Sequence, residues 1–278
     1  MTLINHLPSR KNFRRFRFTQ VEWLFTFIIV VVLAGCNSDT QDSESLWIPE
    51  PLLDEAAEEP DAAAIMAHMS EFMSSHQELA AEAFVTYEVL QESGQILSFD
   101  MLQRITYRKP DKLHWVVVFD DGTQESAWFS NGSFAMLKEP ALVYGQIEVS
   151  SSVSEMVLEL EEDYGLDVPF VDILSGQMAD LWLGGDVSSW FVGEAWVDGT
   201  WTDHIALRRD GVDFEIWVRK GEQPFPVKLS IVLTEEAGMP RNTTRFRKWA
   251  NVVPPTVSFD FVPPEGAEQI EVVPVLQY

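Results

Sequence analysis

The chain has 278 residues and is strongly acidic, with 44 Asp and Glu against 19 Lys and Arg and a formal net charge of −25. Such a charge repels nucleic acid and anionic lipid head groups, so it excludes a protein that binds either of them through its overall charge. A single cysteine excludes an intrachain disulfide, and the ten Trp and eighteen Phe supply the apolar area of the core that must hold the fold instead.

Residues 1–35 have the organisation of a secretory signal peptide. Basic residues between Arg10 and Arg17 precede an apolar run, residues 23–34, that only Thr26 interrupts. The run is shorter than the roughly 20 residues that a membrane-spanning helix needs. A cleaved signal is therefore the interpretation, and an uncleaved membrane anchor is the alternative.

The apolar run ends in Leu33-Ala34-Gly35-Cys36, which resembles the lipobox of bacterial lipoproteins. The resemblance implies an envelope protein whose Cys36 becomes lipid-modified and N-terminal after cleavage. Asn37 is not the Asp that favours inner-membrane retention in lipoproteins of enterobacterial type, so the outer membrane is expected. Cleavage before Cys36 removes five basic residues and one acidic residue, which takes the net charge from −25 to −29. Attachment to a membrane is therefore expected to come from lipid on Cys36.

Residues 36–60 are predicted to form an acidic, disordered tether. From Asn37 to Pro60 the chain has eight acidic residues and three prolines. Such a segment buries too little apolar surface to offset its loss of conformational entropy. A solvated spacer is the favoured interpretation, and docking of Leu46-Trp47-Ile48 on the domain or on a partner is the alternative.

The next stretch is predicted to be an amphipathic helix that starts after an N-cap at Asp61. Its apolar stripe recurs at steps of three and four residues and comprises Ile65, Met69, Phe72, Met73, His76, Leu79 and Ala80. Its methionines suit an adaptable surface. The stripe either packs in a core or lines and covers an apolar cavity. His68 and His76 lie two turns apart, too far for one metal ion without other ligands.

From Phe84 onward the hydrophobic period changes to two, which predicts antiparallel strands with one buried face. The alternating runs are Leu97, Phe99, Met101, Ile105 and Tyr107; Leu113, Trp115, Val117 and Phe119; Val212, Phe214, Ile216 and Val218; Val227, Leu229, Ile231 and Leu233; and Val257, Phe259 and Phe261. Turn signals such as Asn131-Gly132 and Asp210-Gly211 separate runs and indicate hairpins in a meander.

A helical insert is predicted inside the meander. Ser152 and Glu155 form a capping box, Gly165 ends the first helix, and Asp167 and Pro169 suit the start of a second. The expected fold class is therefore α+β, because a long sheet with one apolar face must curl and helices can fill its concave side.

Several segments resemble a bacterial family of predicted periplasmic proteins of unknown function with the lipoprotein-carrier (LolA/LolB-like) fold. They are Tyr107–Leu113, Pro169–Leu174, Val197–Gly199 followed by His204–Leu207, Asp213–Val218, Pro224–Leu229, Trp249 and Phe259–Pro264. The resemblance covers roughly residues 65–270. It implies a curled, half-open antiparallel β-barrel whose concave face is covered by helices, and a cavity that holds acyl chains in characterised relatives.

The sequence shows no motif of a catalytic site. It has no nucleophile elbow, no phosphate-binding glycine loop and no His-x-x-x-His helix. His114 and His204 are expected to face solvent or to make structural hydrogen bonds. Neither an enzyme nor a metal or cofactor site is expected.

Residues 61–278 are therefore predicted to form a single domain that binds a lipid, an acyl chain or another apolar ligand, including a lipoprotein. The side chains expected to line its cavity are Ile65, Met69, Phe72, Met73, Phe99, Met101, Trp115, Val117, Phe170, Phe214, Ile216 and Leu229. The alternative is an interaction or sensor module of the envelope whose barrel is filled by its own side chains.

Overall fold

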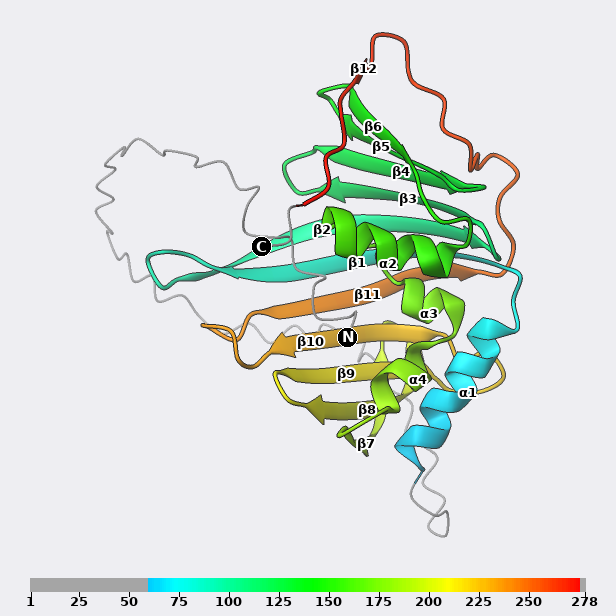
Figure 1. Ribbon diagram of the computed structural model, residues 1–278. Coiled ribbons are helices and arrows are strands. Elements are labelled where there is room, and N and C mark those ends of the chain that lie inside the picture. The colour runs from blue at the N-terminus through cyan, green and yellow to red at the C-terminus, as the bar shows by residue number, and fades with distance from the viewer. Residues whose placement is uncertain (1–59, 276–278) are drawn as a thin grey trace, which may run out of the picture. The chain divides into compact units, whose positions relative to one another are not determined.

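Alternating apolar and polar residues build one long, curled sheet in residues 60–275, which are the residues that this computed structural model describes (Figure 1). The strands are β1 Glu78–Leu90, β2 Ile96–Arg108, β3 Lys112–Phe119, β4 Gln124–Ser130, β5 Ser133–Glu139, β6 Val143–Glu148, β7 Ser188–Val197, β8 Thr200–Arg209, β9 Val212–Arg219, β10 Pro226–Leu233, β11 Arg241–Ala250 and β12 Glu268–Gln269. The helices are α1 Ala62–Ser74, α2 Val153–Tyr164, α3 Val171–Ser175 and α4 Met178–Leu183.

The sheet consists of two meanders that β1 and β11 join by antiparallel pairing, in the order β12-β6-β5-β4-β3-β2-β1-β11-β10-β9-β8-β7. Neighbouring strands are hairpin partners within each meander, as the turn signals predict. Only β12 pairs in parallel, with β6. The end strands β12 and β7 do not pair with each other, so the sheet stays open. This confirms the predicted α+β fold with a half-open, curled sheet.

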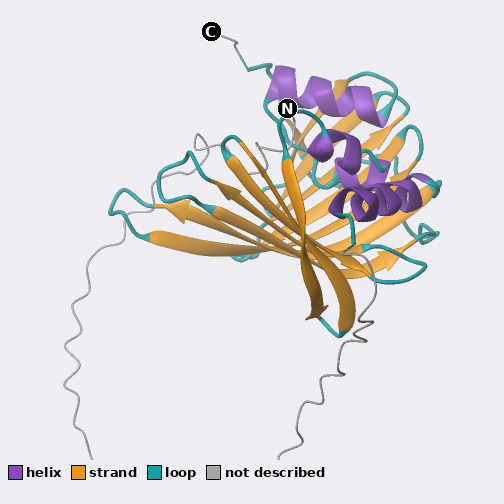
Figure 2. Cartoon of the chain, turned by 90° about the horizontal axis from the view of Figure 1, so that it is seen from below, coloured by secondary structure: helices purple, strands orange, loops and turns teal. Residues whose placement is uncertain are grey.

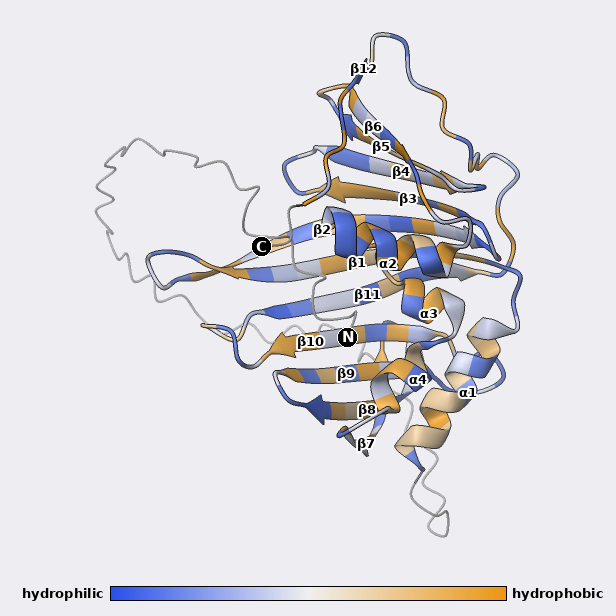
Figure 3. Cartoon of the chain, viewed as in Figure 1, coloured by the Kyte–Doolittle hydropathy of each residue, from blue (hydrophilic) through white to orange (hydrophobic). Residues whose placement is uncertain are grey.

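Each central strand buries one face. In β9, the four alternating residues Val212, Phe214, Ile216 and Val218 are almost fully buried, as predicted. The alternation is visible as orange and blue segments along the strands (Figure 3). All four helices lie on the concave side of the sheet, as Figure 2 shows in a view along it. Because the strands extend beyond the helices, the helices cover only part of that face (Figure 1).

Helix α1 begins as predicted and ends earlier than predicted. The side chain of Asp61 caps it by accepting a 3.0 Å hydrogen bond from the backbone N–H of Ala63. At its other end, the hydroxyls of Ser74 and Ser75 donate to the carbonyls of Glu71 and Phe72, at 2.9 and 2.7 Å. These serine side chains satisfy the last helical carbonyls, so the helix stops at Ser74 rather than near residue 80.

The predicted tail of that helix is instead the start of β1, and the period of two begins before Phe84. His76 lies in the intervening turn, and Leu79 pairs with Tyr107 of β2. Leu79, Ala81 and Ala83 are buried in alternation. Small alanines at buried strand positions give a weak hydrophobic signal, which explains the wrong boundary.

The helical insert contains three helices rather than two. The predicted capping box of α2 is present, since the Ser152 hydroxyl donates to Glu155 at 2.8 Å and accepts from its backbone N–H at 3.3 Å. Gly165 ends α2 in the left-handed conformation, with a φ of 63°. Asp167 and Pro169 do not start α3, which begins after Phe170 without a side-chain cap. Helix α4 was not predicted from the sequence.

The predicted strand through Val257, Phe259 and Phe261 is wrong. These residues lie in an irregular segment that leads from β11, in the interior of the sheet, to the edge where β12 pairs with β6 (Figure 1). The prolines that flank the segment lack the N–H groups that a strand needs. Its aromatic residues pack on the sheet instead, with the Phe261 ring centroid 5.0 Å from that of Trp128.

Candidate functional site

The candidate site is the apolar space between the concave face and helices α1, α3 and α4. Met66, Met69 and Met73 of α1 point into it at successive turns and are fully buried. Leu174 of α3 and Met178 of α4 are buried beside them. Seven of the nine methionines of the chain belong to this core or pack against it, namely Met66, Met69, Met73, Met101, Met136, Met156 and Met178. Methionine is flexible and polarizable, so this interior can repack around different shapes.

All twelve side chains predicted to line a cavity belong to this one cluster or pack against it. Nine are buried: Met69, Met73, Met101, Trp115, Val117, Phe170, Phe214, Ile216 and Leu229. Ile65, Phe72 and Phe99 are half-buried at its margin. The sheet and the helices therefore bring the predicted residues together.

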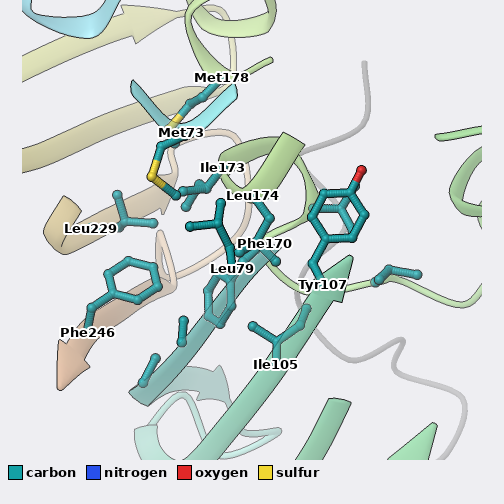
Figure 4. Close-up of a cluster of buried hydrophobic side chains, with 14 of the residues drawn as sticks. Met73, Leu79, Ile105, Tyr107, Phe170, Ile173, Leu174, Met178, Leu229 and Phe246 are labelled. Atoms are coloured by element: carbon teal, nitrogen blue, oxygen red, sulfur yellow. The ribbon is translucent and has the colours of Figure 1, made fainter. Parts of the chain in front are cut away.

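Protein side chains fill the space beneath the helices in this structure. Figure 4 shows Met73, Leu174 and Met178 from three helices converging on Leu79 and Leu229 of the sheet. The twelve predicted residues thus form a packed cluster, and an apolar ligand would have to displace some of them.

Close packing also ties the helices to one another. The Ser70 hydroxyl of α1 accepts a 2.9 Å hydrogen bond from the backbone N–H of Ala179 in α4. Gly176, at the end of α3, lies so close to α1 that a Cβ there would be 2.6 Å from the Ser70 carbonyl oxygen. The three helices therefore cover the sheet as one unit.

Aromatic rings anchor the C-terminal end of α1 to the sheet. The Phe72 ring stands edge-on to Phe225, with centroids 4.8 Å apart, and Phe225 stacks on Trp249 at 5.1 Å. Trp249 contacts Phe246, which in turn meets Phe170 before α3 at 5.2 Å. This chain of rings joins α1, the ends of β10 and β11, and the start of α3.

A small hollow lies between α2 and α3, and carboxylates line part of it. Its volume is about 10 Å³, about the space of one water molecule, and its lining includes Glu161, Asp167 and Asp172. Burial, with the nearby Glu161 charge, raises the pKa of Asp167 to about 7 and that of Asp172 to about 6. At neutral pH, Asp167 is therefore partly protonated.

Sequence reasoning missed two polar groups at the edge of the apolar space. The Trp182 indole of α4 is 1% exposed, and its Nε1–H has no hydrogen-bond acceptor among the described residues. The guanidinium of Arg209, at the end of β8, lies over that ring at 4.6 Å from the centroid, and its Nε–H is also buried without a partner. The sequence contained one signal of this pair. Arg209 continues the alternation of the buried Ile205 and Leu207 along β8, which places its side chain on the buried face of the strand.

The two strand histidines lie on the convex face. His204 Nε2 lies 2.9 Å from a Glu215 carboxylate oxygen, and its ring stacks on Trp217 with centroids 4.1 Å apart. Burial lowers the pKa of His204, although Glu215 opposes the shift. His114 packs on Trp128 with centroids 5.2 Å apart, and burial lowers its pKa too. His204 thus makes the structural hydrogen bond that was expected, whereas the contact of His114 is with an aromatic ring.

The described residues show neither a metal-ligand cluster nor a membrane-spanning helix. Within residues 60–275, no three His, Cys, Asp or Glu side chains converge where they could hold a metal ion. None of the helices in that range combines the length and apolar character needed to cross a membrane. Cys36, the signal sequence and the tether lie outside the described residues.

A family model for "predicted periplasmic protein (DUF2092)" matches residues 62–273. This match confirms the family resemblance, which predicted coverage of roughly residues 65–270. A comparison with curated proteins gave no match.

Several solved structures have a similar fold. An uncharacterized conserved protein from Thermus thermophilus is 10% identical, with 76% of this chain and 98% of that one covered and a TM-score of 0.42. The lipoprotein LppX of Mycobacterium tuberculosis is 15% identical over 69% of this chain and 97% of its own, with a TM-score of 0.39. A LolA superfamily protein from Nitrosomonas europaea is 8% identical over 72% and 96%, with a TM-score of 0.28.

Proposed function

From the premise that the chain belongs to this family of predicted periplasmic proteins, we propose that it is a lipid-anchored envelope protein that binds an acyl chain or another apolar ligand. In this proposal residues 1–35 are a signal peptide, Cys36 carries the lipid, and residues 36–60 tether a single domain, residues 61–278. The protein faces the periplasm, from the outer membrane, and acts as a carrier or chaperone rather than as an enzyme.

One observation carries the proposal: the methionine-rich interior lies beneath short helices on a sheet that does not close. Helices α3 and α4 have five and six residues, too few to be stable alone, so packing on the sheet holds them in place. Because the sheet stays open and the helices cover only part of its concave face, a ligand can approach along that face. An acyl chain that slides between helices and sheet would replace apolar contacts with apolar contacts, so the exchange costs little free energy.

The test is uptake of a fatty acid by the full chain purified from bacterial membranes. Native mass spectrometry is expected to show bound lipid. A nitroxide-labelled fatty acid is expected to quench the fluorescence of Trp182, which lies inside the proposed site. The Trp182→Phe variant separates this signal from that of the other tryptophans.

A matched pair of variants tests the role of methionine. Met69→Leu with Met73→Leu keeps the side-chain volume but stiffens the interior, and is expected to weaken uptake several-fold at nearly unchanged stability. Met239→Leu is the control, because Met239 is 58% exposed and remote from the core. Equal uptake by both variants would contradict the role of methionine, and clean protein without any uptake would contradict the proposal.

The packed interior favours a second function, an interaction or sensor module without a small ligand. Its prediction is a specific envelope partner that is cross-linked in cells, together with an interior that stays closed to every lipid offered. Absence of uptake combined with such a partner would establish this second function over the first.

A further inference from the structure

Arg209 and Trp182 form a pair of unsatisfied donors at the margin of the apolar space. Trp182 stacks on Phe214 at a centroid distance of 4.1 Å, so its ring belongs to the core, while Arg209 lies over the same ring at 4.6 Å. In residues 60–275 only three buried side-chain polar atoms lack a hydrogen-bond partner, and these two groups contribute two of them. The third, Gln103 Oε1, is an uncharged acceptor on another strand.

Arg209 also differs from the other seven arginines of the described range. Five of them have a carboxylate within 4.0 Å: Arg104, Arg108, Arg208, Arg241 and Arg245. Within residues 60–275 Arg209, Arg219 and Arg247 have no such partner, and of these three only Arg209 has a buried side-chain nitrogen, Nε, without a hydrogen bond. A buried donor without an acceptor destabilises the fold, and a charged donor does so more than a neutral one, so an acceptor from outside the domain would relieve both groups.

We propose that Arg209 and Trp182 bind the carboxylate of a fatty acid whose hydrocarbon tail enters the apolar space beneath α4. This inference rests on the proposed function, which it deepens by naming the head group. The guanidinium balances the negative charge and the indole N–H supplies a second donor.

A carboxylate fits the pair better than other acceptors do. A water molecule would accept a hydrogen bond but leave the guanidinium charge unbalanced. A phosphate carries more negative charge than the single arginine neutralises, and Asp210 and Asp186 follow Arg209 and α4 in the chain. A planar carboxylate carries one charge and matches the fork of the guanidinium.

The experiment compares oleate with its methyl ester, which has the same tail and no charge, on the full chain. We expect oleate to bind at least about tenfold more tightly, the size of one charged hydrogen bond. Arg209→Gln is expected to remove this preference while it keeps the affinity for the ester. Trp182→Phe, which keeps an aromatic ring and loses the N–H, is expected to reduce the preference by a few-fold. Oleoyl lysophosphatidic acid distinguishes a phosphate from a carboxylate.

Arg219→Gln is the matched control. Arg219 also lies over an aromatic ring, that of Phe225 at 5.6 Å, and it has no carboxylate within 4.0 Å in the described range. Arg219→Gln should leave the preference for oleate over its methyl ester unchanged. An unchanged preference in Arg209→Gln, or tighter binding of the lysophosphatidic acid than of oleate, overturns the head-group assignment alone. Failure of all three ligands to bind overturns the proposed function and this inference with it.

Discussion

The two faces of the sheet hold their residues in place by different means. On the concave face, large apolar side chains such as Phe214 and Leu79 are packed against the helices. On the convex face, charged side chains pair across neighbouring strands. Arg104 and Lys248 both contact Glu82, at 2.9 and 3.4 Å. Buried apolar area stabilises a fold far more than exposed ion pairs do, so the concave face carries most of the stability.

The two faces also differ in the surroundings of their basic side chains. On the convex face most of them have a carboxylate partner, and Lys228 lies over the Trp217 ring at 3.9 Å from its centroid. These charges keep the convex face solvated and disfavour association of the protein with other chains through it. Arg209 differs from these cations because its Nε is buried without a hydrogen-bond partner in the described range. This buried donor is what suggests a ligand there.

Substitution of Gly176 tests how tightly the helices that cover the concave face pack on one another. Gly176→Ala should lower the free energy of unfolding by about 3 kcal/mol, because the Cβ would be 2.6 Å from the Ser70 carbonyl oxygen and the φ of +77° disfavours alanine. Urea unfolding measures it.

Gly94→Ala provides the control for Gly176→Ala. Gly94 has a similar φ of +83°, but a Cβ there meets nothing within 4 Å. It should therefore cost only about 1 kcal/mol, the backbone contribution alone. Equal losses in the two variants would show that the helices are not packed tightly on one another.

The next effect concerns pH and the hollow between α2 and α3. Burial raises the pKa of Asp167 to about 7, well above its value in an unfolded chain, so its contribution to stability is complete at acid pH. The contribution is lost as the pH rises from about 4 through 7, when the carboxylate ionises in a partly buried position. Partial exposure reduces the effect to about 1–2 kcal/mol.

Asp167→Asn should therefore be more stable than the parent at pH 8 and equally stable at pH 4. Thermal unfolding across this range measures the difference, and Asp163→Asn, at an exposed position on α2, is the control. A pH-independent difference between Asp167→Asn and the parent would show that the hollow does not disfavour the charge.

The sequence predicted the parts of the fold that depend on strong periodicity or on local caps. The alternation from Val212 to Val218, the N-cap at Asp61 and the capping box at Ser152 are all present in the structure. In each case neighbouring residues contain the whole signal. The twelve predicted cavity residues cluster for the same reason, because they were chosen from the apolar faces of predicted elements.

The errors arose where distant parts of the chain decide the outcome. The pairing of Leu79 with Tyr107 makes β1 begin before Phe84, although the local pattern continues the helix. Phe259 is buried although it does not belong to a strand. Its ring is covered by Arg108 of β2, whose guanidinium lies 5.0 Å from the ring centroid. The contact of Trp182 with Arg209 joins α4 to β8. Its only local signal is a charged residue at a strand position where the alternation predicts an apolar one.

The Arg104–Glu82 ion pair allows a direct test of the convex face. Arg104→Gln removes one partner of Glu82 and should change the free energy of unfolding by at most about 1 kcal/mol, because the pair is exposed and Lys248 remains near the carboxylate. The Arg104 hydrogen bond is the main cause that holds the pKa of Glu82 below its usual value. The variant should therefore raise that pKa, which an NMR titration of the carboxyl group detects.

The double variant Arg104→Gln with Lys248→Gln completes the test of the convex face. It removes both partners of Glu82, so the pKa should rise further, while the loss of stability stays well below that of Gly176→Ala. High salt should reproduce part of the change in the parent protein, since it screens exposed charges. A loss of several kcal/mol would mean that the ion pairs, and not the concave face alone, hold this sheet together.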